Sequence, residues 1–214
     1  MYELITLAIT ETFPNTDEFS VVAYDVKSKN ILSFDLVRDQ IVSTNGEVMW
    51  DIGFTTFVDE IRIKESKYGN EMYEAFKVKL ANNSIDLLKK ILEAKVLNGD
   101  KFFVNTKERY AIVKVNEVED ISIDKKTESK GGQINKYRIK ANITCLKEAK
   151  EFLNKDYRWV HYWNWIIKNS EFENKRKKYL DLLNRKDKEL YFILYRHKFQ
   201  GNSSRYWISG MHWL

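Results

Sequence analysis

Residues 19–36 read FSVVAYDVKSKNILSFDL, and this stretch decides the kind of fold that the chain adopts. Two runs rich in β-branched and aromatic residues, 19–26 and 31–36, flank the polar residues 28–30. Runs of this composition favour strands, and a short polar turn between two of them favours a hairpin. The stretch therefore predicts two antiparallel strands joined by a tight turn.

The residues on either side of this hairpin continue the strand pattern. Strands are predicted at ELITLAIT (3–10), at FTTFVDEIRIKES (54–66), where apolar and charged residues alternate, and at EMYEAFKVKL (71–80). Apolar residues then recur at helical spacing in IDLLKKILEAKVL (85–97). This spacing predicts a helix that Ser84 can cap and that Asn98 and Gly99 end.

The second half of the chain has a similar strand-rich plan. Strands are predicted at 101–105, 109–123, 134–146, 189–197 and 205–213, with a polar loop at 124–133. A helical block is predicted over 147–186, with one helix starting near Tyr157 and another over 171–186. Strands and helices do not alternate as βαβ units, which argues against a doubly wound sheet and favours small antiparallel barrels. We predict a mainly β (α+β) chain with domains at about 1–99 and 100–214.

Charge is distributed unevenly along the 214 residues. Residues 1–150 hold 23 Lys and Arg against 24 Asp and Glu, whereas residues 151–214 hold 13 against 7 and so carry a net charge of +6. The same last segment holds five of the six tryptophans and all three histidines. This asymmetry favours an anionic partner for the basic part, with well-solvated Lys-rich helices as the alternative interpretation.

The patterns that common catalytic and metal sites need are absent from the sequence. Its one cysteine, Cys145, lies among alternating apolar residues, so we expect a buried thiol, no internal disulfide and a reducing, cytoplasmic location. No apolar run reaches membrane-spanning length, and the N-terminus does not resemble a signal peptide. The histidines lack metal-ligand spacing, and no phosphate-binding glycine motif or nucleophile elbow occurs. We expect a non-catalytic protein that uses no metal or cofactor.

The segment 157–168, YRWVHYWNWIIK, is the densest aromatic stretch. On a helix starting near Tyr157 it divides into two stripes, one with Trp159 and Trp163 at core spacing and the other with His161 and Trp165. The second stripe is either packed inside the protein or a platform on which nucleobases stack, bordered by the KRKK run at 175–178. Three further basic residues flank the last hairpin turn and are candidates for phosphate contacts. The candidate nucleic-acid-binding residues are Tyr157, Arg158, His161, Trp165, Lys168, Arg196, Lys198 and Arg205.

Several segments together resemble the bacterial dual OB-containing domain family. The opening ELITLAIT with FSVVAYDVKSKNILSF resembles the start of that family, and FVDEIRIK (57–64) resembles one of its strands. RYAIVKVNEVEDISI with INKYRIKANI is similar to its second barrel, and ELYFILYRHKFQG with RYWISGMHW to its closing hairpin. Where members commonly have Trp-Ile-Arg-Pro after the first hairpin, this chain reads ILSFDLVRD (31–39). The helical block at 147–186 also departs from the family pattern and is predicted to be an insertion. The resemblance implies two tandem OB-like antiparallel barrels and, by analogy of fold, nucleic-acid binding.

The main hypothesis is therefore a nucleic-acid-binding protein that contacts a single strand through a basic, aromatic C-terminal surface. One alternative is a protein-interaction component of a phage-related defence or counter-defence system, because Tyr, Trp and Arg often anchor protein interfaces. A second alternative is a protein that binds a small anionic nucleotide without turning it over.

Overall fold

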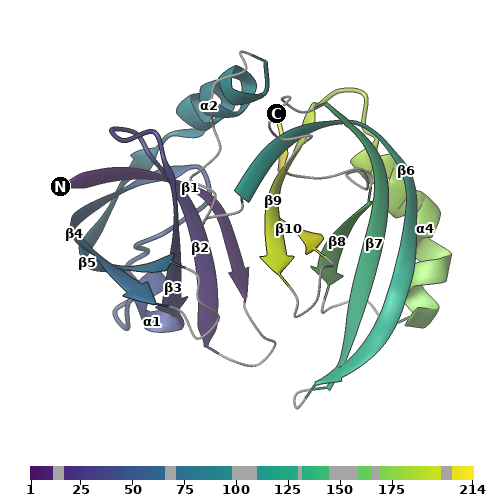
Figure 1. Ribbon diagram of the computed structural model, residues 1–214, viewed down its shortest axis with the longest axis horizontal. Helices are drawn as coiled ribbons and strands as arrows, with labels where there is room; N and C mark the ends of the chain where they lie inside the picture. Colours follow the sequence, from purple (N-terminus) through teal and green to yellow (C-terminus); the bar gives the residue numbers. More distant parts are fainter. Residues whose placement is uncertain are drawn as a thin grey trace. The chain divides into compact units, whose positions relative to one another are not determined.

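The computed structural model describes residues 1–11, 17–65, 71–97, 110–129, 132–144, 159–164, 169–198 and 204–214. The chain divides into two compact units, one built on Met1–Lys95 and the other on Ala111–Leu214. Strands make up most of the described residues (Figure 1), which confirms the mainly β prediction. The boundary predicted between residues 99 and 100 lies outside the described part of the chain. Inside that part, no helix combines the length and the apolar character needed to span a membrane.

In the described part of the first unit, five strands form a closed barrel. They are β1 (Tyr2–Glu11), β2 (Glu18–Asp25), β3 (Ile31–Val37), β4 (Phe54–Glu65) and β5 (Glu71–Asn83). The order around the barrel is β1-β2-β3-β5-β4, and β4 pairs back with β1. The pairing of β3 with β5 is parallel and the others are antiparallel, so the predicted antiparallel barrel contains one parallel contact.

The β2–β3 hairpin confirms the strand pair predicted from residues 19–36. Its turn is held by Asp25, which is 3% exposed. The Asp25 carboxylate accepts hydrogen bonds from the backbone N–H groups of Lys27 and Ser28, both at 3.2 Å, and from the Ser28 hydroxyl at 2.6 Å. Lys29 adopts a φ of 60°. Short side chains that accept bonds from the following backbone favour turns, so local chemistry shapes this hairpin.

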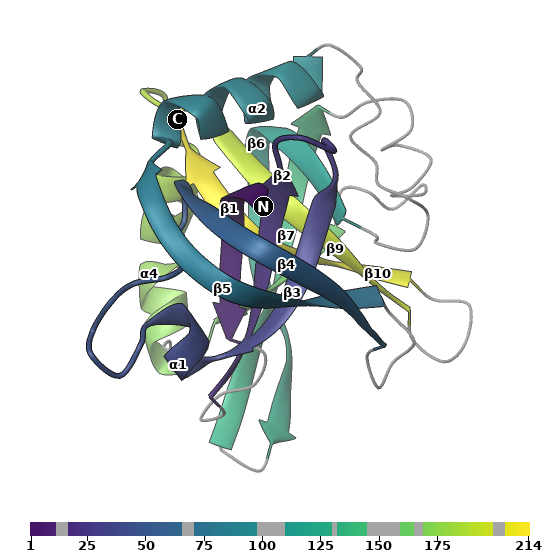
Figure 2. The ribbon, with the colours of Figure 1, turned by 90° about the vertical axis from the view of Figure 1, so that its left-hand side faces the viewer.

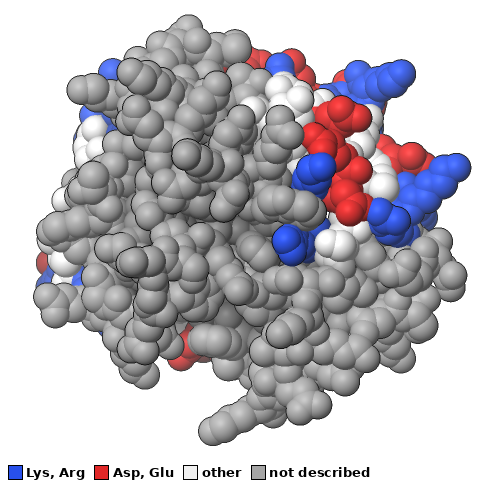
Figure 3. Space-filling view, turned by 45° about the vertical axis from the view of Figure 1, so that its right-hand side comes forward, with Lys and Arg blue, Asp and Glu red and all other residues white. Residues whose placement is uncertain are grey.

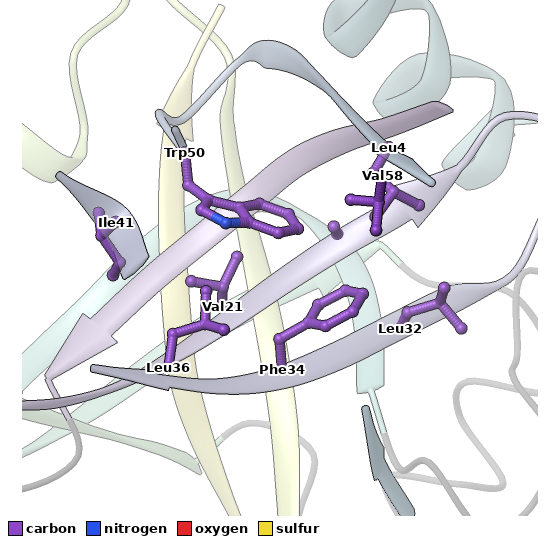
Figure 4. Packing of buried hydrophobic residues seen from close by; sticks show 9 residues of the cluster. Leu4, Val21, Leu32, Phe34, Leu36, Ile41, Trp50 and Val58 are labelled. Atoms are coloured by element: carbon purple, nitrogen blue, oxygen red, sulfur yellow. The ribbon is translucent and has the colours of Figure 1, made fainter. Parts of the chain in front are cut away.

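The inward face of the hairpin supplies the core of the first barrel. The ring of Phe34 on β3 packs against that of Trp50, with centroids 5.1 Å apart, and both residues are fully buried. Trp50 belongs to the segment between β3 and β4, which also contains the short helix α1 (Arg38–Ile41). Figure 4 shows Trp50 lying over Phe34 and Val21, with Ile41 at the edge of the cluster. The segment between the third and fourth strands therefore completes the core.

Helix α2 (Ile85–Leu97) confirms the helix predicted at these residues. Its first turn lies against Gly53, where a Cβ atom would stand 3.2 Å from Cγ1 of Ile85 and where φ is 80°. Ser84 precedes the helix as predicted, but its hydroxyl forms a hydrogen bond with Thr55 Oγ1 on β4 at 2.5 Å. Ser84 therefore ties the start of the helix to the barrel. In Figure 2, α2 and α1 lie at opposite ends of this barrel.

In the described part of the second unit, five strands form another closed barrel. They are β6 (Tyr110–Ser129), β7 (Gly132–Thr144), β8 (Trp159–Asn164), β9 (Leu190–Lys198) and β10 (Ser204–Trp213). The order is β6-β7-β8-β10-β9, with β8 parallel to β10, and helix α4 (Asn169–Leu183) lies between β8 and β9 in the chain. Counted from the start of each unit, both barrels thus have the order 1-2-3-5-4. Both also have a parallel pair between strands 3 and 5 and a helix between strands 3 and 4.

The helix predicted to start near Tyr157 is wrong, because residues 159–164 form strand β8. The segment reads WVHYWN, and aromatic and β-branched residues fit a pleated strand surface. β8 also pairs with both β7 and β10, so barrel closure favours the strand over the helix. Within the block predicted over 147–186, the described residues are helical in α4, which confirms the helix predicted at 171–186. The loop predicted at 124–133 is mostly strand, since β6 and β7 extend into it.

Two side chains, one in the middle of α4 and one just after it, fix this helix to β6. Asn184 follows the helix, and its Oδ1 accepts a hydrogen bond from the N–H of Val118 at 2.7 Å while its Nδ2 donates to the Val118 carbonyl at 2.8 Å. Arg176 donates from Nε to the carbonyl of Ile121 at 3.0 Å and forms an ion pair with Asp120. The register of β6 against β7 shifts between Val118 and Asp120. The helix therefore supplies hydrogen bonds where the strand is irregular.

Candidate nucleic-acid interface

The sequence-predicted site residues fall into two groups. Tyr157, Arg158, Trp165 and Lys168 lie outside the described residues. His161 is on β8, Arg196 and Lys198 are on β9, and Arg205 is on β10. The second group can therefore be located by strand and register.

The β9–β10 hairpin places Arg196 and Lys198 on one of its faces and Arg205, which pairs with His197, on the other. Its register pairs Lys198 with Ser204, His197 with Arg205 and Arg196 with Tyr206. These are successive pairs at the turn end of the hairpin. Three candidate phosphate contacts thus lie within three consecutive rungs, on neighbouring strands.

His161 lies in the middle of a ladder that sequence reasoning missed. The register of β7 and β8 pairs Lys136 with Trp163, Arg138 with His161, and Lys140 with Trp159. Basic residues thus occupy alternate positions of β7, and aromatic residues or histidine occupy the positions directly opposite on β8. We call these six residues the β7–β8 ladder. The alternation of Lys136, Arg138 and Lys140 was visible in the sequence, but their partners were not.

The burial of β7 shows which face of the strand the ladder occupies. Ile139 and Ala141 are 2% and 1% exposed and belong to the core, whereas Arg138 and Lys140, which alternate with them along the strand, are partly exposed. Successive residues of a strand point to opposite faces, and directly paired residues share a face. The ladder positions therefore lie on the outer face of the second barrel. The helix-based division of Trp159 and Trp163 from His161 no longer holds, because all three occupy alternate positions of one strand.

One end of the ladder is electrically balanced by acidic residues. Lys140 Nζ lies 2.9 Å from Glu119 Oε2, with the two side chains 36% and 30% exposed. Arg176 of the KRKK run is paired with Asp120, while Lys177 and Lys178 are exposed. Figure 3 shows basic and acidic side chains intermixed on the described part of one face. Among the described residues of the run at 175–178, one of the three cations is therefore paired with a carboxylate, so the run is not a uniformly basic patch.

Charge nevertheless differs strongly between the two units. Residues 1–110 hold 14 Lys and Arg against 18 Asp and Glu, and residues 111–214 hold 22 against 13. The net charges are therefore −4 and +9. The unit boundary separates the charges more sharply than the division at residue 150, because β6 and β7 contribute further lysines. The excess of positive charge therefore lies on the second unit.

Some C-terminal aromatic residues belong to the core and do not offer an exposed surface. Tyr191 and Phe192 are fully buried. Trp207, which pairs with His161 by register, is 6% exposed, so the row that contains Arg138 and His161 ends at a buried residue on β10. His212 is 8% exposed. Among the residues that the structure describes, no three His, Cys, Asp or Glu side chains gather in a group that could hold a metal ion.

No protein-family model matches the sequence, and neither does any of the curated proteins compared with it.

Proposed function

We propose that the chain binds single-stranded nucleic acid through its second unit and that both units are OB-like barrels. An OB fold is a five-stranded barrel whose second and third strands, with the loops after the first and fourth strands, bind oligonucleotides. The shared strand order and the helix between strands 3 and 4 support this assignment. Helix α4 is then the regular helix of the second barrel and not an insertion.

The observation that carries the proposal is the β7–β8 ladder. β7 and β8 are the second and third strands of their barrel, so the ladder occupies the face that binds oligonucleotides in OB folds. Stacking of a nucleobase on an aromatic ring contributes about 1–3 kcal/mol, and neighbouring cations attract the phosphates. The aromatic residues of β8 would supply the stacking, and the basic residues of the neighbouring β7 would supply the attraction for phosphates. Arg196 and Lys198 share one face of the strand that precedes the loop after the fourth strand, and this loop is the other part of that binding face. Arg205 follows the loop and lies on the opposite face of the hairpin.

The spacing of the ladder favours an unstacked single strand over a duplex. Alternate residues of a β-strand are about 6.6–6.8 Å apart, whereas successive bases of one strand in duplex DNA are about 3.4 Å apart. Bases that each stack on one of Trp159, His161 and Trp163 must therefore separate from one another. The stacked bases of a duplex do not meet this requirement.

The corresponding face of the first unit lacks the ladder. On the face of β2 and β3 opposite the core cluster, Ser20 pairs with Asp35, Val22 with Ser33, and Tyr24 with Ile31, and the last four of these residues are at most 5% exposed. None of these residues is basic, and the unit has a net negative charge. We therefore assign binding to the second unit alone.

Fluorescence anisotropy with labelled single strands of about 12 nucleotides and with the matching duplex tests this proposal. We expect binding of the single strand at about 50 mM salt and a steep fall in affinity at about 200 mM. Trp163→Leu should weaken binding about tenfold or more, since it removes a stacking interaction of about 1–3 kcal/mol. Phe76→Leu is the matched control, because Phe76 forms an aromatic–arginine pair with Arg62 in the first unit, 4.5 Å from guanidinium to ring centre. Its affinity should equal that of the unchanged protein.

The outcomes separate the three functional hypotheses. Tighter binding of the duplex, or equal affinities of Trp163→Leu and the unchanged protein, contradicts the ladder. Thermal stabilisation by mononucleotides without oligonucleotide binding supports the small-ligand alternative. No response to either, with one stoichiometric protein recovered in a pull-down, supports the protein-interaction alternative. If Trp163→Leu does not fold, Lys136→Gln tests the same ladder through the salt dependence of binding.

A further inference from the structure

Three exposed valines surround helix α1 in the first unit. Val37, Val42 and Val48 are 47%, 39% and 38% exposed. Val37 directly precedes α1, Val42 directly follows it, and an isolated antiparallel bridge pairs Val42 with Val48. Single apolar residues at a protein surface are common, whereas a group of them marks a surface that another molecule covers.

Exposed carboxylates flank these valines. Asp39 lies within α1, and Glu47 directly precedes the third valine. Neither carboxylate forms an ion pair with another residue that the structure describes, whereas Arg38, the cation of α1, is paired with Asp17 at 3.1 Å. The group is therefore apolar at its centre and negatively charged around it. We call it the α1 patch, which consists of Val37, Asp39, Val42, Glu47 and Val48.

Helix α4 of the second unit offers the complementary chemistry. Figure 1 shows this helix lying along the outside of its barrel. Leu182 is 47% exposed, and Lys178 lies one helical turn before it on the same face. Lys177 and Lys178 are exposed, and neither pairs with a carboxylate in the part of the chain that the structure describes. Asp181 is the one acidic residue among residues 176–183, so the α4 patch of Lys177, Lys178 and Leu182 is positively charged.

We infer that the α1 patch of one copy of the chain docks on the α4 patch of a second copy. An apolar centre with complementary charges at the rim is the usual build of a protein interface. The net charges of the two units, −4 and +9, act in the same sense. Two α1 patches repel each other, as do two α4 patches, so the contact joins unlike surfaces.

A contact between unlike surfaces has consequences for assembly. Each copy carries one patch of each kind and can therefore have two neighbours, which gives rings or open chains of copies. Three valines and one leucine make a small apolar centre, typical of weak interfaces that bury less than about 1,200 Å². Neither patch contains a residue of the β7–β8 ladder, so the inference is independent of the proposed function.

Sedimentation equilibrium of the full chain without nucleic acid, from about 1 μM to about 1 mM, tests this inference. At about 0.1 M salt the average mass should rise above that of one chain as the concentration increases. At about 1 M salt it should fall back, because a Debye length of about 3 Å screens the charges at the rim. Glu47→Lys and Lys178→Glu should each weaken association about tenfold or more, since each brings like charges together. The double variant keeps the net charge of the unchanged protein and should regain association.

Asp59→Lys and Lys79→Glu are the matched controls, because they make the same changes of charge at exposed positions of β4 and β5. Both should associate like the unchanged protein. The mass of one chain at every concentration overturns the inference, as does equal weakening in the controls or a double variant as weak as the single ones. A single-chain mass with lower oligonucleotide affinity in Lys178→Glu would instead assign α4 to a nucleic-acid contact. If Glu47→Lys unfolds at a lower temperature, Asp39→Lys tests the same patch and must show the same weakening.

Discussion

Replacing Glu119 with Gln should strengthen nucleic-acid binding by releasing Lys140. The ion pair between them has a distance of 2.9 Å, and its side chains are 36% and 30% exposed. Pairs that remain this accessible to solvent contribute about 0–1 kcal/mol to stability, so the variant should unfold close to the temperature of the unchanged protein. Lys140 then becomes available to a phosphate beside Trp159, the residue directly opposite it on β8.

The size of the effect follows from counterion release. Each phosphate neutralised on a single strand adds about 0.7 to the slope of log affinity against log salt. Between about 50 and about 200 mM salt, one further neutralised phosphate therefore makes the fall in affinity about 2.6-fold larger. Glu119→Gln should bind more tightly than the unchanged protein at the low-salt end, and its advantage should shrink by this factor at the high-salt end.

Anisotropy titrations at several salt concentrations measure both slopes. For Lys140→Gln, the slope of log affinity against log salt should equal that of the unchanged protein or be smaller. The double variant Glu119→Gln with Lys140→Gln should have the same slope as Lys140→Gln. Glu117→Gln controls for net charge, because Glu117 is an exposed carboxylate on the same strand that pairs by register with Asn142. Identical slopes for Glu119→Gln and the unchanged protein, or the same gain in Glu117→Gln, would refute the reasoning.

Three further predictions concern the first unit. Asp25→Ala removes the acceptor of three hydrogen bonds in the β2–β3 turn. It should lower the free energy of unfolding, measured by urea denaturation, by about 2–4 kcal/mol. Asp25→Asn should be less destabilised than Asp25→Ala. Trp50→Ala leaves a cavity beside Phe34 and should cost about 3–5 kcal/mol, in the same measurement. Partial removal from water raises the pKa of Asp35, with Lys64 opposing and Glu18 reinforcing the rise. Because a raised carboxyl pKa makes stability fall as the pH rises through it, Asp35→Asn should be more stable than the unchanged protein at neutral pH. That difference should vanish below the ordinary Asp pKa of 3.8, and a constant difference in melting temperature across pH would contradict this assignment.

Elements whose geometry is local were predictable. The β2–β3 hairpin follows from two strand-forming runs and from Asp25, whose carboxylate accepts hydrogen bonds from the turn that follows it. Helix α2 follows from its apolar spacing. In both cases the residues that shape the element lie within it or next to it.

The segment 159–164 shows where this reasoning stops. Its aromatic residues are compatible with a helical stripe and with alternation along a strand, and no local feature chooses between them. The choice is made by β7 and β10, which pair with the segment on its two sides. The error moved the candidate site as well, because a helix separates His161 from Trp159 and Trp163 whereas a strand groups them.

Composition and alternation along the chain were enough to establish a mainly β protein whose later part is basic and rich in aromatic residues, because these are properties of single segments. The β7–β8 ladder came only from folding. It depends on register between strands, and a slip of one residue would move every side chain of a strand to the other face. Register is set by the closure of the whole barrel, in which each strand must match two neighbours at once.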